Sequence, residues 1–196
     1  HNTGEVWATM LWECYVALLR DPRYPFKDAQ ARMQRYLVAS LKLTPPEPTL
    51  LEARDALLAA ALATDPGDFA LFWAAFARRG AGVGAEGPPK DSRDNATVKE
   101  SFEVGNDLEI VEVKLTDDVI GCDHDGIVDE GEVGAVIVTA RNGGAGTLTA
   151  SEVRVSTSQK GITFDGEGRL ALPTLLPFQA ETVRVPFRVH GAGAAT

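Results

Sequence analysis

The chain has 196 residues, of which 44% are hydrophobic and 24% charged, as in ordinary globular proteins. This length allows one domain or two small ones, and no stretch of about 18 residues lacks a charged side chain, so the sequence predicts no membrane span. The net charge is −9, and residues 1–84 are balanced with nine basic and nine acidic side chains, whereas residues 85–196 hold ten and nineteen. This imbalance predicts two units, and the acidic second unit argues against binding of nucleic acid, because phosphates would be repelled.

Residues 1–19 predict a helix that is apolar on almost every side. Apolar residues recur there at helical spacing, and the polar ones form one narrow row in which His1, Glu5, Thr9 and Glu13 follow one another at i, i+4. A helix of this kind is expected to be buried. The polar row is expected to face water, a cleft or a polar partner.

Three further helices are expected before residue 85. The second is predicted to begin near Lys27 and to end at the prolines of residues 45–48. Thr49 with Glu52 is a capping box for the third helix, and Asp65 followed by proline is the start signal of the fourth. The sequence therefore predicts an all-α subdomain of four helices over residues 1–84.

The hydrophobic period changes to two from residue 108 onward. Before that point, residues 85–106 are rich in Gly, Pro and Asp and show no period, which predicts a linker. Short apolar runs at near-regular intervals then predict about six or seven strands over residues 107–191. This pattern indicates an antiparallel β-sandwich of immunoglobulin-like kind.

Three blocks in the helical part carry a family resemblance. The run His1-x-x-Gly4-x-Val6-Trp7-Ala8-x-x-Leu11 resembles the helix that follows the active site in the fungalysin family, which are secreted thermolysin-like zinc metalloendopeptidases. Residues 48–60 (PTLLEARDALLAA) and 72–85 (FWAAFARRGAGVGA) are similar to two further segments of that family. The resemblance implies the C-terminal lobe of a thermolysin-like catalytic unit. More loosely, residues 131–156 resemble cell-adhesion-related sandwich modules of secreted bacterial enzymes.

The chemistry implied by this resemblance needs a zinc ion bound by the motif H-E-x-x-H and a further carboxylate. That motif is absent, and the only histidines are His1, His124 and His190, so the chain alone is expected to be inactive and the zinc ligands to lie upstream. The resemblance gives His1 a catalytic role as a hydrogen-bond donor to the oxyanion of the tetrahedral intermediate. Two other interpretations stay open: His1 is a solvent-exposed residue without a partner, or it forms a metal pair with Glu5.

The acidic loop at residues 123–132 (DHDGIVDEGE) is a second candidate site. Its oxygen ligands suit structural calcium, and seven acidic residues lie between Lys114 and Arg141 with no Lys or Arg among them. Such like charge is costly unless a cation neutralises it. The predicted metal ligands are Asp123, Asp125, Asp129 and Glu132. A solvated acidic turn without metal is the alternative.

These observations predict the C-terminal segment of a secreted zinc metalloendopeptidase. Its partners would be the upstream catalytic lobe of the same protease and a protein or peptide substrate, and the helices would form a wall of the active-site cleft. The β-sandwich would act as a spacer or a binding module. The alternative is a non-enzymatic secreted binding or adhesion module that carries a helical subdomain.

Overall fold

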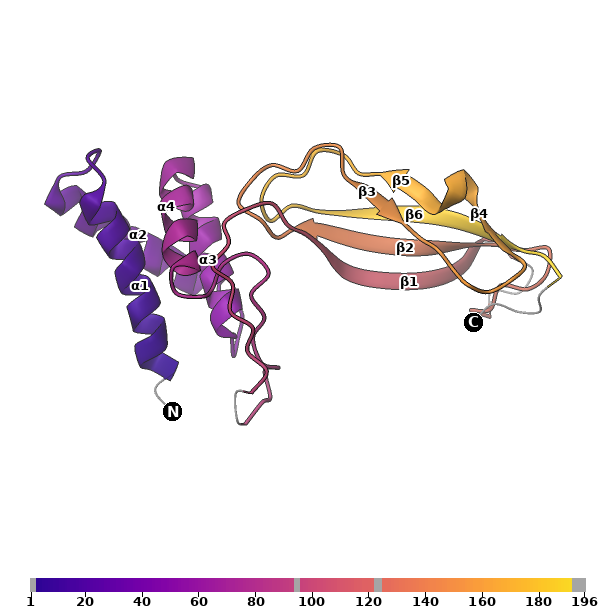
Figure 1. The fold of residues 1–196 in the computed structure, drawn as a ribbon, viewed down its shortest axis with the longest axis horizontal. Helices are drawn as coiled ribbons and strands as arrows, with labels where there is room; N and C mark the ends of the chain where they lie inside the picture. Colours follow the sequence, from indigo (N-terminus) through magenta and orange to yellow (C-terminus); the bar gives the residue numbers. More distant parts are fainter. Residues whose placement is uncertain (1–2, 94–95, 122–124, 192–196) are drawn as a thin grey trace. The chain divides into compact units, whose positions relative to one another are not determined.

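The computed structural model describes residues 3–93, 96–121 and 125–191. Contacts divide the chain into two compact units, residues 1–105 and residues 106–196. In the described part of the chain, the first unit contains four helices and the second an antiparallel sheet, so the predicted class of α plus β is confirmed (Figure 1). Among the described residues, no helix has both the length and the apolar character that a membrane crossing requires.

The helical unit consists of α1 (Thr3–Arg20), α2 (Phe26–Leu43), α3 (Leu50–Leu62) and α4 (Pro66–Ala77). Helices α1 and α3 each pack against α2 and α4. The centre of the unit is rich in aromatic residues, because Phe72, Trp73 and Phe76 of α4 are fully buried, as are leucines of α1 and α3. Burial of such large side chains is the main source of stability in a unit of this size.

Two helix caps that the sequence predicts are confirmed. At the start of α3, the backbone N–H of Glu52 donates to the Thr49 hydroxyl over 3.2 Å, and the Glu52 carboxylate accepts from the Thr49 N–H over 2.8 Å. At the start of α4, the Asp65 carboxylate accepts from the N–H of Gly67 over 2.8 Å. These side chains satisfy N–H groups that have no partner within the helix, so both helices begin where the sequence indicates.

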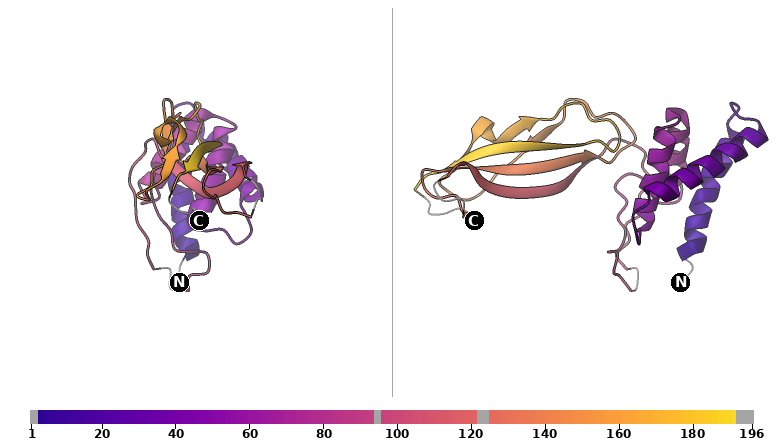
Figure 2. Two further views of the ribbon diagram at one scale, coloured as in Figure 1. Left: turned by 90° about the vertical axis from the view of Figure 1, so that its right-hand side faces the viewer. Right: turned by 180° about the vertical axis from the view of Figure 1, so that it is seen from behind.

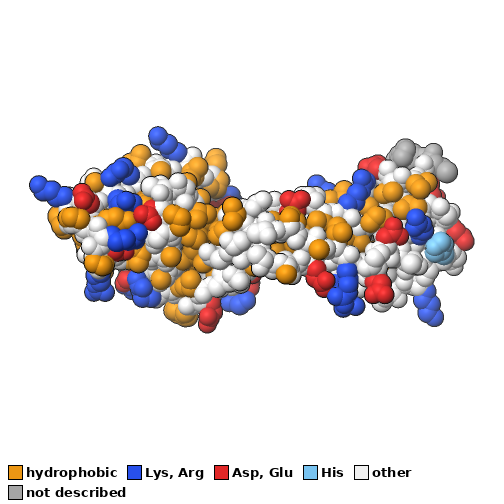
Figure 3. Space-filling model, turned by 90° about the horizontal axis from the view of Figure 1, so that it is seen from above, with side chains coloured by type: hydrophobic (Ala, Val, Ile, Leu, Met, Phe, Trp, Pro, Cys, Tyr) orange, Lys and Arg blue, Asp and Glu red, His pale blue; other side chains and the backbone are white. Residues whose placement is uncertain are grey.

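Helix α1 is only half covered, which differs from the expectation that it is buried. Its buried residues are Met10, Cys14 and Leu18, one stripe at i, i+4 spacing, while Val6 is 48% and Trp12 62% exposed. The helices α2 and α4 cover that stripe and leave the opposite face of α1 open. Apolar side chains also reach the surface elsewhere, between groups of charged residues (Figure 3).

The segment after α4 folds back on the helical unit. Gly82 N–H donates to the Ser101 carbonyl over 2.7 Å, and Ser101 N–H donates to the Gly80 carbonyl over 2.8 Å. Glu86 and Lys99 exchange two further backbone hydrogen bonds of 2.9 Å. Parts of the segment for which composition predicts a linker are therefore hydrogen-bonded within the first unit, and contacts group the chain up to Gly105 with the helices.

The second unit is built from two antiparallel layers. A four-stranded sheet has the order β1-β2-β6-β4, and a two-stranded sheet pairs β3 with β5 (Figures 1 and 2). The strands are β1 (Leu108–Ile120), β2 (Val133–Asn142), β3 (Glu152–Arg154), β4 (Ile162–Phe164), β5 (Arg169–Ala171) and β6 (Ala180–Val189). Apolar residues of β2 and β6 pack against Val153, Leu172 and Leu175 to form the core. The finer assignment to an immunoglobulin-like sandwich stays a prediction.

Gly134 in β2 tests the packing of this core. A Cβ at this position would lie 2.5 Å from Val128 Cγ2, 2.9 Å from Phe187 Cζ and 3.0 Å from the Thr116 carbonyl oxygen. We expect Gly134→Ala to lower the free energy of unfolding of the second unit by about 1–3 kcal/mol, because the added methyl overpacks the site. Urea denaturation followed by far-UV circular dichroism measures the change.

The control is Gly105→Ala, since a Cβ there meets no atom within 4 Å. All three tryptophans belong to the helical unit, so the denaturation midpoint seen by fluorescence should stay constant in both variants. Equal stability of the two variants by circular dichroism would contradict the packing described for Gly134.

Candidate functional site

The exposed face of α1 is the first candidate site. Glu5, Ala8, Thr9 and Trp12 line a shallow depression there, and the Thr9 hydroxyl donates to the Glu5 carbonyl over 2.7 Å. Trp12 meets Tyr15 edge to face with ring centroids 5.7 Å apart. His1, the predicted catalytic residue, lies outside the described residues, directly before this face in the chain. The face therefore presents polar and aromatic side chains.

The predicted polar row of α1 has two parts with different surroundings. Glu5 and Thr9 are exposed, whereas Glu13 accepts a hydrogen bond of 2.6 Å from Arg79 and lies 3.6 Å from Arg78. The hydrogen bond from Arg79 is the main influence that holds the pKa of Glu13 below its usual value, against the opposing effect of desolvation. Glu13 therefore ties α1 to the C-terminal end of α4, whereas Glu5 and Thr9 lie on the exposed face of the helix.

Aromatic stacking also fixes α1 on α4. The rings of Trp7 and Phe76 are stacked at an interplanar angle of 20°, with centroids 6.0 Å apart. Together with the buried stripe and the Glu13 ion pair, this contact determines which face of α1 is turned outward. The open face is thus set by the packing of the opposite face.

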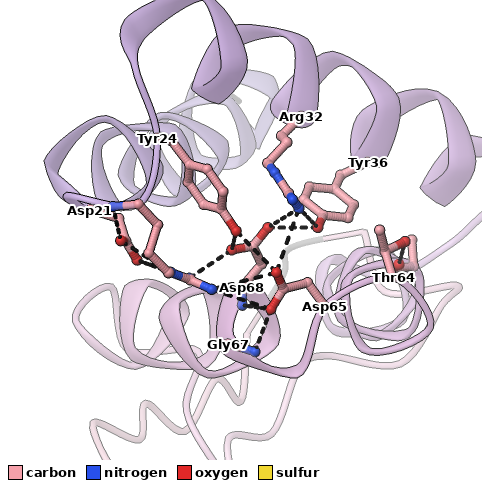
Figure 4. Close-up of polar contacts among 10 residues, drawn as sticks. Asp21, Tyr24, Arg32, Tyr36, Thr64, Asp65, Gly67 and Asp68 are labelled. Atoms are coloured by element: carbon pink, nitrogen blue, oxygen red, sulfur yellow. Dashed lines mark hydrogen bonds and ion pairs between the residues drawn. The ribbon is translucent and has the colours of Figure 1, made fainter.

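A buried carboxylate cluster holds the other helices in place (Figure 4). Asp68 in the first turn of α4 is 0% exposed, and its two oxygens accept four hydrogen bonds. The donors are Arg23 at 2.9 Å, Tyr24 at 2.9 Å, Arg32 at 2.9 Å and Tyr36 at 2.6 Å. They come from the α1–α2 loop and from α2, so Asp68 connects three parts of the chain.

The electrostatics of this cluster indicate a structural role. Burial, and next the hydrogen bond to Asp68, raise the pKa of both Tyr24 and Tyr36, so the two phenols remain protonated donors. Asp68 has no exposed surface through which a substrate would reach it. Sequence reasoning identified the Asp65 cap and missed Asp68, because an acidic residue in a first helical turn is ordinary and its distant donors have no local signal.

Arg54 connects two of the blocks that carry the family resemblance. It belongs to the block of residues 48–60, within α3, and its guanidinium donates to the carbonyls of Ala81 and Gly82 over 2.9 and 3.0 Å. The same group lies 4.9 Å from the ring centre of Trp73 and pairs with Asp55 at 2.7 Å. The glycine-rich end of the block of residues 72–85 is therefore held in place by an arginine of the block of residues 48–60.

The acidic loop of the second unit is only partly described. Asp123 lies outside the described residues, as does His124. Asp125 accepts from the N–H of Ile127 over 2.8 Å, and Glu132 accepts from the N–H of Asp129 over 3.0 Å. Asp117, which is buried, accepts from the N–H of Gly126 over 2.8 Å. Within the described part of the chain, no three His, Cys, Asp or Glu residues converge as a metal site.

Comparisons with known proteins agree with the helical unit. Residues 1–85 match the model of the fungalysin metallopeptidase (M36) family, so this region is similar to a part of that family's sequence. The extracellular metalloproteinase mep of Aspergillus flavus is 38% identical to the chain over an alignment of 98 residues, which covers 44% of the chain. Extracellular metalloproteinase 5 of Arthroderma benhamiae is 33% identical over 48% of the chain. The chain covers only 15% and 17% of these two relatives.

Asp68→Asn tests the buried cluster. The amide offers one acceptor oxygen where the carboxylate offers two, and it leaves Arg23 and Arg32 only the less buried carboxylates of Asp21 and Asp65 as counter-charges. We expect the free energy of unfolding of the helical unit to fall by about 3 kcal/mol or more. Tryptophan fluorescence in urea measures it, since Trp73 is fully buried in this unit.

The matched control is Asp28→Asn, an exposed carboxylate in the first turn of α2. That change removes only a favourable charge at a helix N-terminus, which is worth less than about 1 kcal/mol. If the two variants lost the same stability, the cluster would not be the main polar support of the unit.

Proposed function

We propose that the chain is a C-terminal segment of an extracellular zinc metalloendopeptidase whose helical unit forms one wall of the active-site cleft. The observation that carries the proposal is the agreement between the family match, residues 1–85, and the helices of the first unit. The names of the fungal relatives, extracellular metalloproteinases, support both the activity and the location. The substrates would then be proteins or peptides.

The zinc ligands belong to another part of the protease. The three histidines of this chain stand far apart in sequence and none is in the motif H-E-x-x-H, so its own residues do not fit a zinc site. The zinc would activate water for attack on the peptide bond and would be held by the upstream catalytic lobe. This chain would contribute the surface opposite that site.

The half-covered α1 supports this arrangement. A helix that keeps Val6 and Trp12 largely exposed, while the other face is fixed by aromatic and ionic contacts, is suited to line a groove made with a second lobe. Glu5 and Thr9 would offer polar contacts to a bound peptide along the helix. His1 lies two positions before Thr3 in the sequence, where α1 begins. It would donate a hydrogen bond to the oxyanion, which forms only when the substrate carbonyl is attacked.

His1→Ala in the full-length protease tests this role. Loss of an oxyanion donor weakens the transition state more than the ground state, so kcat should fall about a hundredfold or more while KM changes little. His190→Ala is the control, since His190 is exposed and belongs to the second unit. A loss in kcat of less than about threefold for His1→Ala would exclude the role.

Two observations separate the protease from a non-enzymatic binding module. Proteolysis by the full-length product should be abolished by a zinc chelator and restored by zinc. The coding sequence upstream of His1 should contain H-E-x-x-H within about 200 residues of it. Absence of that motif would exclude the protease.

For the second unit, we infer an appended immunoglobulin-like module whose acidic loop binds structural calcium. The support is the concentration of carboxylates at residues 123–132 together with the backbone hydrogen bonds that Asp117, Asp125 and Glu132 accept, which give the loop a defined shape. The module would act as a spacer or as a binding module for protein, glycan or cell surface.

Calorimetric titration of the chain with Ca²⁺ tests the loop. We expect heat of binding and a higher melting temperature in millimolar calcium, because a ligand that binds only the folded state stabilises it. Both effects should vanish in the double variant Asp125→Asn/Asp129→Asn and persist in Glu130→Gln, a neighbouring carboxylate outside the predicted ligand set. No heat and no rise in melting temperature for the unaltered chain would leave the acidic turn without metal.

A further inference from the structure

Strand β1 has an open edge. It pairs only with β2, on one side, and no other strand of the described chain pairs with its second side. Its 13 residues are nevertheless rich in exposed apolar side chains, including Ile110, Val111, Val113 and Leu115. Proteins usually protect such an edge, because its free N–H and C=O groups are ready to pair with another strand.

The apolar side chains of β1 continue the core face of the sheet. Val113 is the cross-strand partner of Val138, and Leu115 that of Val136, and side chains of directly paired residues point to the same face. Val136 and Val138 are buried in the core, whereas Val113 is 59% and Leu115 53% exposed. The difference arises because the core residues of the second layer pack over β2 and β6, so the row on β1 lies beyond that layer.

The opposite face of β1 carries a pair of unlike charges. Glu112 and Lys114 are two residues apart and therefore lie on the same side of the strand. Their carboxylate and ammonium groups are 2.7 Å apart, and both side chains are about half exposed. In this part of the strand, one face carries the apolar side chains of Val113 and Leu115, and the other face carries one negative and one positive charge.

From this pattern we propose that β1 docks antiparallel on β1 of a second copy of the chain, about a two-fold axis at Val113. A two-fold axis perpendicular to the sheet keeps both apolar rows on the same face. With the axis at Val113, Glu112 of each copy faces Lys114 of the other, and the two valines face each other. Unlike charges directly opposite one another stabilise a strand pair, as do apolar pairs.

Three nearby registers of the same symmetry are less favourable. An axis at Glu112 would place two glutamates opposite each other, and an axis at Lys114 would place two lysines opposite each other. An axis at Leu115 would set Val113 against Asp117. Like charges directly opposite destabilise strand pairs, so the charge pattern selects Val113. The bulge between Ile110 and Glu112 and the irregularity after Thr116 limit the pairing to the short stretch between them.

The proposed pairing joins the two sheets into one and brings the two exposed apolar rows side by side. Val113 and Leu115 of both copies then form a continuous strip beside the cores. Because the regular stretch is short, the dimer is expected to be weak and to depend on protein concentration.

Sedimentation of the 196-residue chain over a concentration series up to about 200 µM tests the proposal. The chain should show reversible dimer formation. Glu112→Lys and Lys114→Glu should each be monomeric, because each places like charges across the axis. An equimolar mixture of the two variants should dimerise, since every position then meets an unlike charge. The double variant Glu112→Lys/Lys114→Glu should dimerise as the unaltered chain does.

Glu103→Lys is the matched control, an equal change of charge at an exposed position of the helical unit, and it should leave the dimer intact. Far-UV circular dichroism of each variant confirms that the sheet is retained. A monomeric unaltered chain at the highest concentration would overturn the proposal. Single variants that still associate would overturn it as well and would direct attention to another surface, such as the open face of α1, as would failure of the mixture to pair.

Discussion

The arrangement of the α1–α2 loop, α2 and α4 depends on one buried carboxylate. Asp68 has no contact with solvent, and its two oxygens receive hydrogen bonds from two arginines and two tyrosines. A buried carboxylate is tolerated only when its lone pairs and its charge are both satisfied, so the four donors must be held where they are. This requirement fixes the α1–α2 loop and α2 against the start of α4.

The position of α1 is determined by its contacts with α4 and with the residues that follow α4. One face of the helix is committed to α4 through Trp7 and Phe76 and to the arginines after α4 through Glu13. The other face keeps Val6 and Trp12 largely exposed. The same helix therefore has a structural face and an available face. The proposed role in a protease cleft uses the available face, while the structural face ensures that it is presented in a fixed orientation.

The second unit shows a comparable asymmetry. Its larger sheet is covered by a smaller one, and the cover extends over β2 and β6. Val113 and Leu115 of β1 lie on the same face of the sheet as their buried partners Val138 and Val136 in β2. They are more than half exposed, because the smaller sheet does not extend over β1. In both units, an element whose sequence is suited to burial is only half buried, and these two elements are the surfaces for which we propose partners.

Much of the architecture was determined by the sequence itself. Local signals such as the Thr49–Glu52 box, the Asp65 cap and the change of hydrophobic period near residue 108 depend on near neighbours in the chain, so they predicted the helices, the strands and the division between them. The family blocks likewise depend on residue order. The missing zinc motif is also a property of sequence alone.

Only the tertiary structure decided which apolar faces are covered and which charged groups meet. Asp68 and its donors are more than thirty residues apart, Arg54 reaches carbonyls beyond α4, and the exposure of Val113 depends on how far a separate layer extends. Hydrophobic periodicity predicts which face of a helix or strand is suited to burial, but it does not predict whether another element covers that face. That information resides in contacts between distant segments, because burial is a property of the assembled chain.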